Sequence, residues 1–241
     1  MAAMKRHRQL TLPVELPETA QFETFVTGEN EQLVNYLREF EFSNQSFQQL
    51  ALVGTPGSGK SHLLFAFVDR MQQSGVQAMY IDCKEIQAQF PPSILDGLHQ
   101  YPILILDGID AVVGDEEWCV ALFTLINRFT DQQSGLLVWA AENDPSAQGI
   151  VVPDLTSRLE LAIRFRLQKL SDEKKVTALK LHAKARGMKL SREVAEYLLQ
   201  RLSRDMRTLM KVLKALDQLS IREQRPITLP FVRNALKEVT L

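Results

Sequence analysis

The sequence predicts a doubly wound α/β domain, built on a parallel sheet of five strands, followed by a smaller helical domain. Three observations support this prediction. Short apolar runs alternate with helical patterns over residues 21–170, which is typical of a parallel sheet covered by helices on both faces. A glycine-rich loop joins the first apolar run to the helix that follows it. From residue 171 onward the pattern contains helices only.

The α/β domain should open with an amphipathic helix at about 30–40, ahead of the sheet. Its strands are the apolar runs at 50–53, 78–82, 103–107, 136–141 and 162–167. Because these runs are almost continuously apolar, we expect them to be buried on both faces. Helical patterns fall between them at about 60–73, 84–89, 116–131 and 154–159. Residues 1–20 precede the domain as a tail.

The helical domain, residues 171–241, should begin at Ser171, a favourable N-cap residue that is followed by two acids in the first helical turn. Gly187 is expected to end this helix. Further helices are expected at 192–202, 205–222 and 230–239, with Pro230 near the first turn of the last one. Together they predict a small helical bundle.

The composition is that of an ordinary globular protein, with 45% hydrophobic residues, 24% charged residues and a formal net charge of −1. This balance argues against a strongly basic nucleic-acid-binding protein. The charge is uneven, however, because residues 1–170 carry 12 basic and 21 acidic residues, whereas residues 171–241 carry 16 and 8. The basic second domain is therefore expected to face an acidic partner, nucleic acid or nucleotide phosphates.

Cys83 and Cys119 lie neither in a C-x-x-C pair nor near clustered histidines, so we expect reduced thiols in the core. No run approaches the roughly 18 apolar residues of a membrane span. The basic tail is also not followed by the apolar stretch of a signal peptide. We therefore expect a cytoplasmic protein without membrane contact.

Residues 54–61 read G-T-P-G-S-G-K-S, a complete phosphate loop of the form G-x-x-x-x-G-K-S. Glycines let backbone N–H groups approach a phosphate closely, the lysine supplies a charge, and the serine hydroxyl can bind Mg²⁺. A plain Gly/Pro turn is the alternative, but the apolar run before and the helix after both fit a phosphate loop. We expect ADP or ATP, with other nucleotides left open, to bind at Thr55, Pro56, Gly57, Ser58, Gly59, Lys60, Ser61 and His62.

The run 103–107 ends in Asp107, at the sheet edge where the phosphate loop is also expected. We predict that Asp107 and Ser61 hold Mg²⁺, although a carboxylate at a strand end also serves as a helix cap or turn former. ATP-hydrolysing proteins of the additional-strand class usually place a second acid next, where this chain has Gly108. Intrinsic hydrolysis should therefore be slow, unless Asp110 reaches around the turn.

These segments resemble the AAA+ ATPases of the bacterial initiator clade and, within it, the Hda family of DnaA-homologous regulators that inactivate replication initiation. The resemblance covers nearly the whole chain and implies an AAA+ domain over 21–170 and its lid over 171–241. Residues 22–28 (F-E-T-F-V-T-G) look like the box that cradles the base, which implies contacts from Phe25 and Val26. Asp107 matches the Walker B acid.

Three further segments of the resemblance imply site residues. Residues 140–143 (A-A-E-N) stand where sensor 1 belongs, with Glu142 favoured by alignment and Asn143 by neutrality. Residues 155–159 (L-T-S-R-L) resemble the arginine-finger segment, so Arg158 would point from the rim into a neighbour's nucleotide site. Residues 205–209 (D-M-R-T-L) resemble sensor 2, so Arg207 would couple the phosphates to the lid. The alternatives are a surface arginine or internal ion pair for Arg158, and one more charge on a basic face for Arg207.

Residues 9–14 (Q-L-T-L-P-V) resemble the sliding-clamp-binding peptide of Hda proteins. An extended peptide of this kind would place two leucines in apolar pockets and bond its glutamine at the rim. Two positions depart from the commoner residues, and a disordered tail or a stray edge strand explains the segment about as well. The residues implied in clamp binding are Gln9, Leu10, Leu12, Pro13 and Val14.

The leading functional hypothesis is a nucleotide-bound regulator that docks on the DNA sliding clamp and presents Arg158 to ATP held by DnaA, at the nucleoid during replication. A helicase-loader-like or DNA-associated assembly factor is the second hypothesis. Its lid would bind single-stranded DNA and would need stacking aromatics, but Tyr197 and Phe231 stand at positions expected to be buried. A self-sufficient ATPase or small-molecule kinase is the third, and Gly108 argues against it.

Two expectations concern assembly and DNA. Because the sequence ends after the lid, we expect no helix-turn-helix domain, so that any DNA contact would be weak or indirect and the chain would not be an initiator. Head-to-tail self-association through the rim that carries Arg158 is left open.

Overall fold

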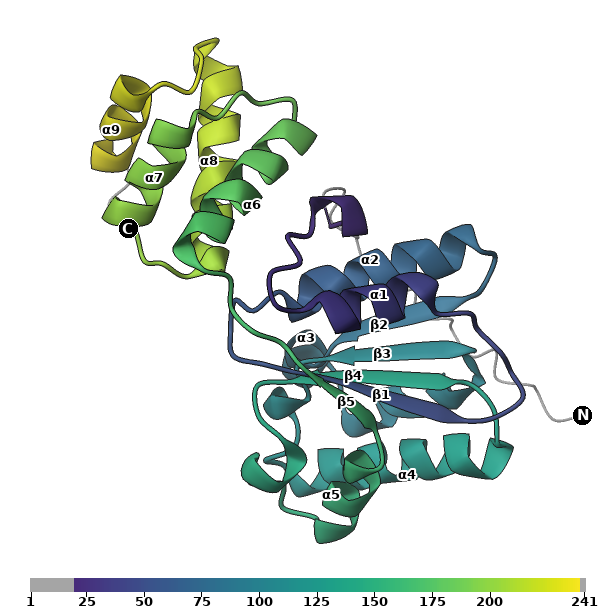
Figure 1. Ribbon diagram of the computed structural model, residues 1–241. Coiled ribbons are helices and arrows are strands. Elements are labelled where there is room, and N and C mark those ends of the chain that lie inside the picture. The colour runs from purple at the N-terminus through teal and green to yellow at the C-terminus, as the bar shows by residue number, and fades with distance from the viewer. Residues whose placement is uncertain (1–19, 239–241) are drawn as a thin grey trace, which may run out of the picture.

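The computed structural model describes residues 20–238, which form an α/β domain and a separate helical lid (Figure 1). The sheet is parallel throughout, with strand order β2-β3-β4-β1-β5. Its strands are β1 (Gln48–Val53), β2 (Ala78–Asp82), β3 (Ile103–Asp107), β4 (Leu136–Ala141) and β5 (Ile163–Arg166). The predicted five-stranded parallel sheet is confirmed, and β4 lies between β1 and β3.

Helices cover both faces of the sheet, as Figure 1 shows. Leu50 and Leu52 of β1 point into a core formed with α1 (Glu31–Glu39) and α2 (Lys60–Gln73). The alternate residues Ala51 and Val53 point to the other core, with α3 (Cys83–Gln89), α4 (Glu116–Gln132) and α5 (Pro153–Glu160). Two apolar faces on each central strand explain why these runs read as continuously apolar.

The expectation of burial on both faces is wrong for β5. Ile163 of this strand is 52% exposed. The reason is that β5 pairs with β1 alone and therefore ends the sheet. Its arginines Arg164 and Arg166 form ion pairs with Asp144, and charged residues of this kind suit an unpaired edge.

The lid consists of α6 (Asp172–Ala185), α7 (Arg192–Arg201), α8 (Met206–Glu223) and α9 (Leu229–Glu238). Ser171 caps α6 by accepting a hydrogen bond from the backbone N–H of Lys174 at 3.4 Å. Gly187 follows the end of α6 with a positive φ of 75°, as predicted. Phe231 is buried as expected, but Tyr197 is only partly buried, and the guanidinium groups of two arginines lie 5.7 and 5.5 Å from its ring centroid.

Short 3-10 helices were not predicted, because three or four residues carry too little periodicity. They are η1 (Phe22–Thr24), η2 (Pro92–Leu95), η3 (Leu98–Gln100), η4 (Ile109–Ala111) and η5 (Pro145–Ala147). The first of them, η1, contacts α6 of the lid. Cys83 and Cys119 are buried free thiols. Over residues 20–238, no helix combines the length and apolarity needed to cross a membrane.

Candidate nucleotide-binding site

The strand registers bring the candidate residues to one edge of the sheet. Asp107 at the end of β3 lies beside Ala140 of β4, and Val53 at the end of β1 lies beside Ala141. The ends of three neighbouring strands therefore carry Asp107 (β3), Glu142 (after β4) and the phosphate loop (after β1). A pocket of about 310 Å³ opens there, between this edge and the lid. It is lined by Thr24, Phe25, Val26, Gly57, Ser58, Gly59, Lys60, Ser61, His62, Asp107, Gly108, Asp110, Glu142, Leu170, Ala178, His182, Met206, Arg207 and Met210.

The phosphate loop has the backbone that its glycines permit. Gly57 and Gly59 have φ values of 79° and 102°, and Gly59 immediately precedes α2. A Cβ atom on Gly59 would lie 2.7 Å from the ring of Phe25, so the loop and the predicted base-binding segment are packed together. The N-terminus of α2 carries a partial positive charge that favours phosphate at this position.

Lys60 is only 8% exposed, and its ammonium group donates a hydrogen bond to the carbonyl oxygen of Gly54. Burial lowers the pKa of Lys60, while the nearby carboxylates of Asp107, Asp110 and Glu142 raise it. Ser58 Oγ is buried and has no partner in the described part of the chain. A charged lysine and a hydroxyl without a partner fit a loop that receives phosphate oxygens.

Asp107 is buried and accepts a 2.7 Å hydrogen bond from the hydroxyl of Tyr80 on β2. Burial and the charge of Asp107 raise the pKa of Tyr80, so the phenol stays protonated and acts as the donor. One carboxylate oxygen of Asp107 is thereby held in place, and Ser61 lines the same pocket. Sequence reasoning missed Tyr80; the available signal was a phenol in a buried strand, whose hydroxyl needs a partner.

The position after Asp107 lacks an acid, and Asp110 is engaged elsewhere. Both carboxylate oxygens of Asp110 accept the backbone N–H of Glu142, at 2.9 and 3.0 Å. Burial is the largest effect on the pKa of Asp110 and raises it. The Asp110 side chain thus ties η4 to the segment after β4, although it also lines the pocket.

The apolar end of the pocket combines Phe25 and Val26 with lid residues. His62 lies edge-on to Phe25 with ring centroids 5.2 Å apart, and its Nε2 is 2.8 Å from the carbonyl oxygen of Gln21. On its other side, His182 of α6 lies edge-on to His62 at 5.3 Å. Burial lowers the pKa of His62 and lowers that of His182 to about 4. Two neutral imidazoles therefore join the apolar end of the pocket to the lid.

The lid reaches the phosphate loop through the start of α8. Arg207 lines the pocket, and its charge lowers the pKa of Lys60. Asp205 caps α8 by accepting the backbone N–H of Thr208 at 3.2 Å. A Cβ atom on Gly57 would overlap Asp205 Oδ1, so this glycine lies directly against the lid and a side chain there would displace the Asp205 carboxylate. Sequence reasoning did not identify Asp205, because only the docked lid brings it to the loop.

Several predicted residues lie outside the pocket. Glu142 lines it, whereas Asn143, the other candidate for sensor 1, does not; nor do Thr55 and Pro56. Arg158, on α5, is also absent from the lining. The predicted clamp-binding residues Gln9, Leu10, Leu12, Pro13 and Val14 fall outside the described residues.

Arg158 lies near the start of β1, away from the strand ends that carry the pocket. Its backbone oxygen accepts a 3.2 Å hydrogen bond from Gln49, and its guanidinium lies over the ring of Phe123 at 5.9 Å. Within residues 20–238, no carboxylate forms an ion pair with it. Among the described residues, the Arg158 guanidinium is therefore not neutralised by an ion pair.

Two family models match the sequence. The model of the bacterial DnaA ATPase domain matches residues 16–166, and the model of the Hda lid domain matches residues 172–236. Domain III of the replication initiation protein DnaA from Thermotoga maritima is similar in structure, with a TM-score of 0.77 and 18% identity, over 92% of this chain and 98% of that chain.

Two other solved structures are similar as well. AMPPCP-bound DnaA from Aquifex aeolicus has a TM-score of 0.64 and 21% identity, over 83% of this chain and 66% of that chain. The RuvB Holliday junction branch migration motor of Thermotoga maritima has a TM-score of 0.61 and 15% identity, over 87% and 66%. These similarities confirm the predicted fold, a five-stranded parallel sheet with a helical lid.

Proposed function

Because this chain belongs to the family of bacterial DnaA ATPase domains and carries a lid that matches the Hda lid model, we propose that it is a nucleotide-bound regulator of replication initiation. It docks on the DNA sliding clamp and stimulates ATP hydrolysis by the initiator DnaA. In this proposal Arg158 enters the nucleotide site of DnaA and stabilises the charge that develops on the γ-phosphate. The bond is broken in the partner.

The observation that carries the proposal is an incomplete hydrolytic pocket combined with an arginine outside it. Gly108 supplies no acid, and Asp110 accepts the backbone N–H of Glu142 with both oxygens. Gly108 has no side chain to orient a water molecule, and the Glu142 N–H fixes the orientation of the Asp110 carboxylate. Arg158, in contrast, has no carboxylate partner within residues 20–238 and lies away from its own pocket.

The chain's own pocket holds ADP or ATP and thereby sets the position of the lid. Lys60 and the loop N–H groups bind the phosphates, while Ser61 and Asp107 hold Mg²⁺, which neutralises phosphate charge when bound. Phe25, His62 and His182 enclose the base end. Arg207 approaches from α8, so the nucleotide contacts both domains. These contacts to the base are apolar, and no charged side chain that the structure describes at this end of the pocket selects adenine over other bases.

Clamp docking is assigned to residues 9–14, on the sequence resemblance alone. Two buried leucines contribute about 3–6 kcal/mol before ordering costs, which corresponds to weak binding for an isolated peptide. A clamp on DNA offers more than one site, and this multiplicity raises the effective affinity. Docking would bring Arg158 to DnaA on the same DNA.

The test measures conversion of DnaA-bound ATP to ADP in the presence of DNA-loaded clamp. Arg158→Ala should reduce the stimulated rate by a factor on the order of 10³ while nucleotide and clamp binding stay unchanged. Arg128→Ala, an exposed arginine on α4 of the same domain, is the matched control and should stimulate normally. Gln9→Ala should weaken capture by the clamp. Full stimulation by Arg158→Ala would remove the mechanism.

A DNA-associated assembly factor is the second candidate, and one observation favours it. Tyr197 is partly exposed, and the guanidinium groups of Arg201 and Arg233 lie 5.7 and 5.5 Å from its ring centroid. Such a group could stack on a base. Binding of single-stranded DNA with a steep salt dependence, lost in Tyr197→Leu, would favour this candidate over the first.

A further inference from the structure

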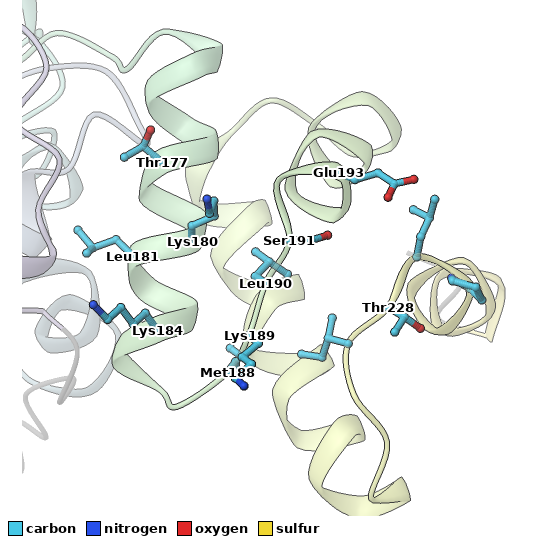
Figure 2. Close-up of a pocket in the computed structure, with 13 residues that line it drawn as sticks. Thr177, Lys180, Leu181, Lys184, Met188, Lys189, Leu190, Ser191, Glu193 and Thr228 are labelled. Atoms are coloured by element: carbon cyan, nitrogen blue, oxygen red, sulfur yellow. The ribbon is translucent and has the colours of Figure 1, made fainter.

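A second large groove lies within the lid, on the side of α6 that faces away from the nucleotide pocket. Its volume is about 990 Å³, and it shares no lining residue with the nucleotide pocket. Ala178 and His182 of α6 line the nucleotide pocket, whereas Thr177, Lys180 and Lys184 line the groove. Figure 2 shows α6 on one side of this groove and the start of α9 on the other, with residues 188–191 between them.

The floor of the groove is apolar. Leu190 and Ile227 are buried at its base. Leu181, Met188 and Leu229 are only partly buried, so each still exposes apolar surface to the groove. Further apolar contact there would remove this surface from water, which favours binding of an apolar side chain.

The rim of the groove is positively charged. Lys180, Lys184 and Lys189 are exposed, and no carboxylate within residues 20–238 forms an ion pair with any of them. Glu193 is the one acidic residue among the lining residues. The N-termini of α7 and α9 also lie at the groove and add partial positive charge. The groove therefore carries a net positive charge and attracts anionic groups.

We propose that this groove is a docking site for an acidic peptide segment of a partner protein. The segment places two or three apolar side chains on the floor and sets Asp or Glu residues against Lys180, Lys184 and Lys189. A nucleic acid would fit the charge but not the floor, because no aromatic side chain lines the groove for base stacking. The proposal is independent of the proposed function, since it uses neither Arg158 nor the nucleotide pocket.

The experiment pans displayed random 12-residue peptides against the full-length chain with ADP present. The enriched clones are then compared, without further selection, on the variant Lys180→Glu/Lys184→Glu/Lys189→Glu. The most enriched peptide is synthesised, and its dissociation constant is measured for both proteins. A matched variant, Lys211→Glu/Lys214→Glu/Lys237→Glu, makes the same charge change at exposed lid lysines outside the groove. Thermal unfolding and ADP affinity report whether each variant is folded.

The expected result is enrichment of peptides that combine Asp or Glu with Leu, Ile or Phe. Their affinity should fall about tenfold or more in the groove variant and by less than about threefold in the matched variant. Leu229→Ala should weaken them severalfold without any change of charge, and it replaces the charge variant if that variant does not fold.

Three results would overturn the proposal: no enrichment, peptides that bind the groove variant as well as the original protein, or equal losses in both charge variants. A single-stranded 20-nucleotide DNA is measured in parallel. DNA binding that needs the three groove lysines, in the absence of any such peptide, would assign the groove to nucleic acid instead.

Discussion

Gly57 is predicted to control how the lid docks on the phosphate loop. Replacement by Ala forces a residue with a Cβ into a φ of 79°, which costs about 1–2 kcal/mol. The same Cβ would overlap Asp205 Oδ1, so the Asp205 carboxylate must shift. Its other oxygen, Oδ2, caps α8, and a shift that breaks this cap costs about 1 kcal/mol more. Gly57→Ala should therefore destabilise the protein by about 2–3 kcal/mol and weaken nucleotide binding.

A double-mutant cycle separates the two contributions. Asp205→Ala alone should cost about 1 kcal/mol through the lost cap. In the double variant the overlap disappears and only the φ penalty and the cap loss remain. The two substitutions should therefore show a coupling energy of about 1 kcal/mol in urea unfolding. Additivity within about 0.3–0.5 kcal/mol would show that Asp205 yields to the new Cβ without losing its cap, and would refute the predicted coupling between the loop and the lid.

Two further predictions concern the pocket. Burial lowers the pKa of His182 to about 4. As the pH falls below about 6.5, the unfolded chain takes up a proton at this histidine while the folded chain does not. The folded state therefore loses stability as the pH falls from about 6.5 towards 4. His182→Gln should remove about 2 kcal/mol of the stability difference between about pH 7.5 and about pH 5, measured by urea unfolding; an unchanged difference would contradict the burial argument. Tyr80→Phe deletes the hydrogen bond to Asp107 and should weaken Mg²⁺-dependent nucleotide binding about tenfold. An equal loss in EDTA would show that Tyr80 does not act through the metal.

Local patterns in the sequence were enough to predict the helices and strands and to place part of the candidate site. The phosphate loop and Asp107 are 46 or more residues apart, yet both could be placed at one sheet edge, because parallel strands all end on the same side. The caps of the lid could also be read from single residues, as Ser171 and Gly187 show. Exposure of β5 was not predicted, since an edge position depends on strand order rather than on the strand's own residues.

The contacts that complete the pocket required the folded chain. Tyr80 reaches Asp107 only because β2 pairs with β3 in a fixed register. His182 meets His62, and Asp205 meets Gly57, only when the lid docks on the α/β domain. No spacing within one element encodes such pairs, so sequence reasoning placed the phosphate-loop residues and Asp107 at one pocket and missed the side chains that join this pocket to the lid.

In the proposed mechanism, the chain's own nucleotide sets its shape while hydrolysis occurs in DnaA. A single-turnover experiment, with labelled ATP placed first on DnaA and then on this chain and with DNA-loaded clamp present in both cases, shows which protein breaks the bond. Label on DnaA should be converted to ADP rapidly, and label on this chain should remain ATP. Rapid conversion of the label held by this chain, above all with the chain alone, would contradict this mechanism.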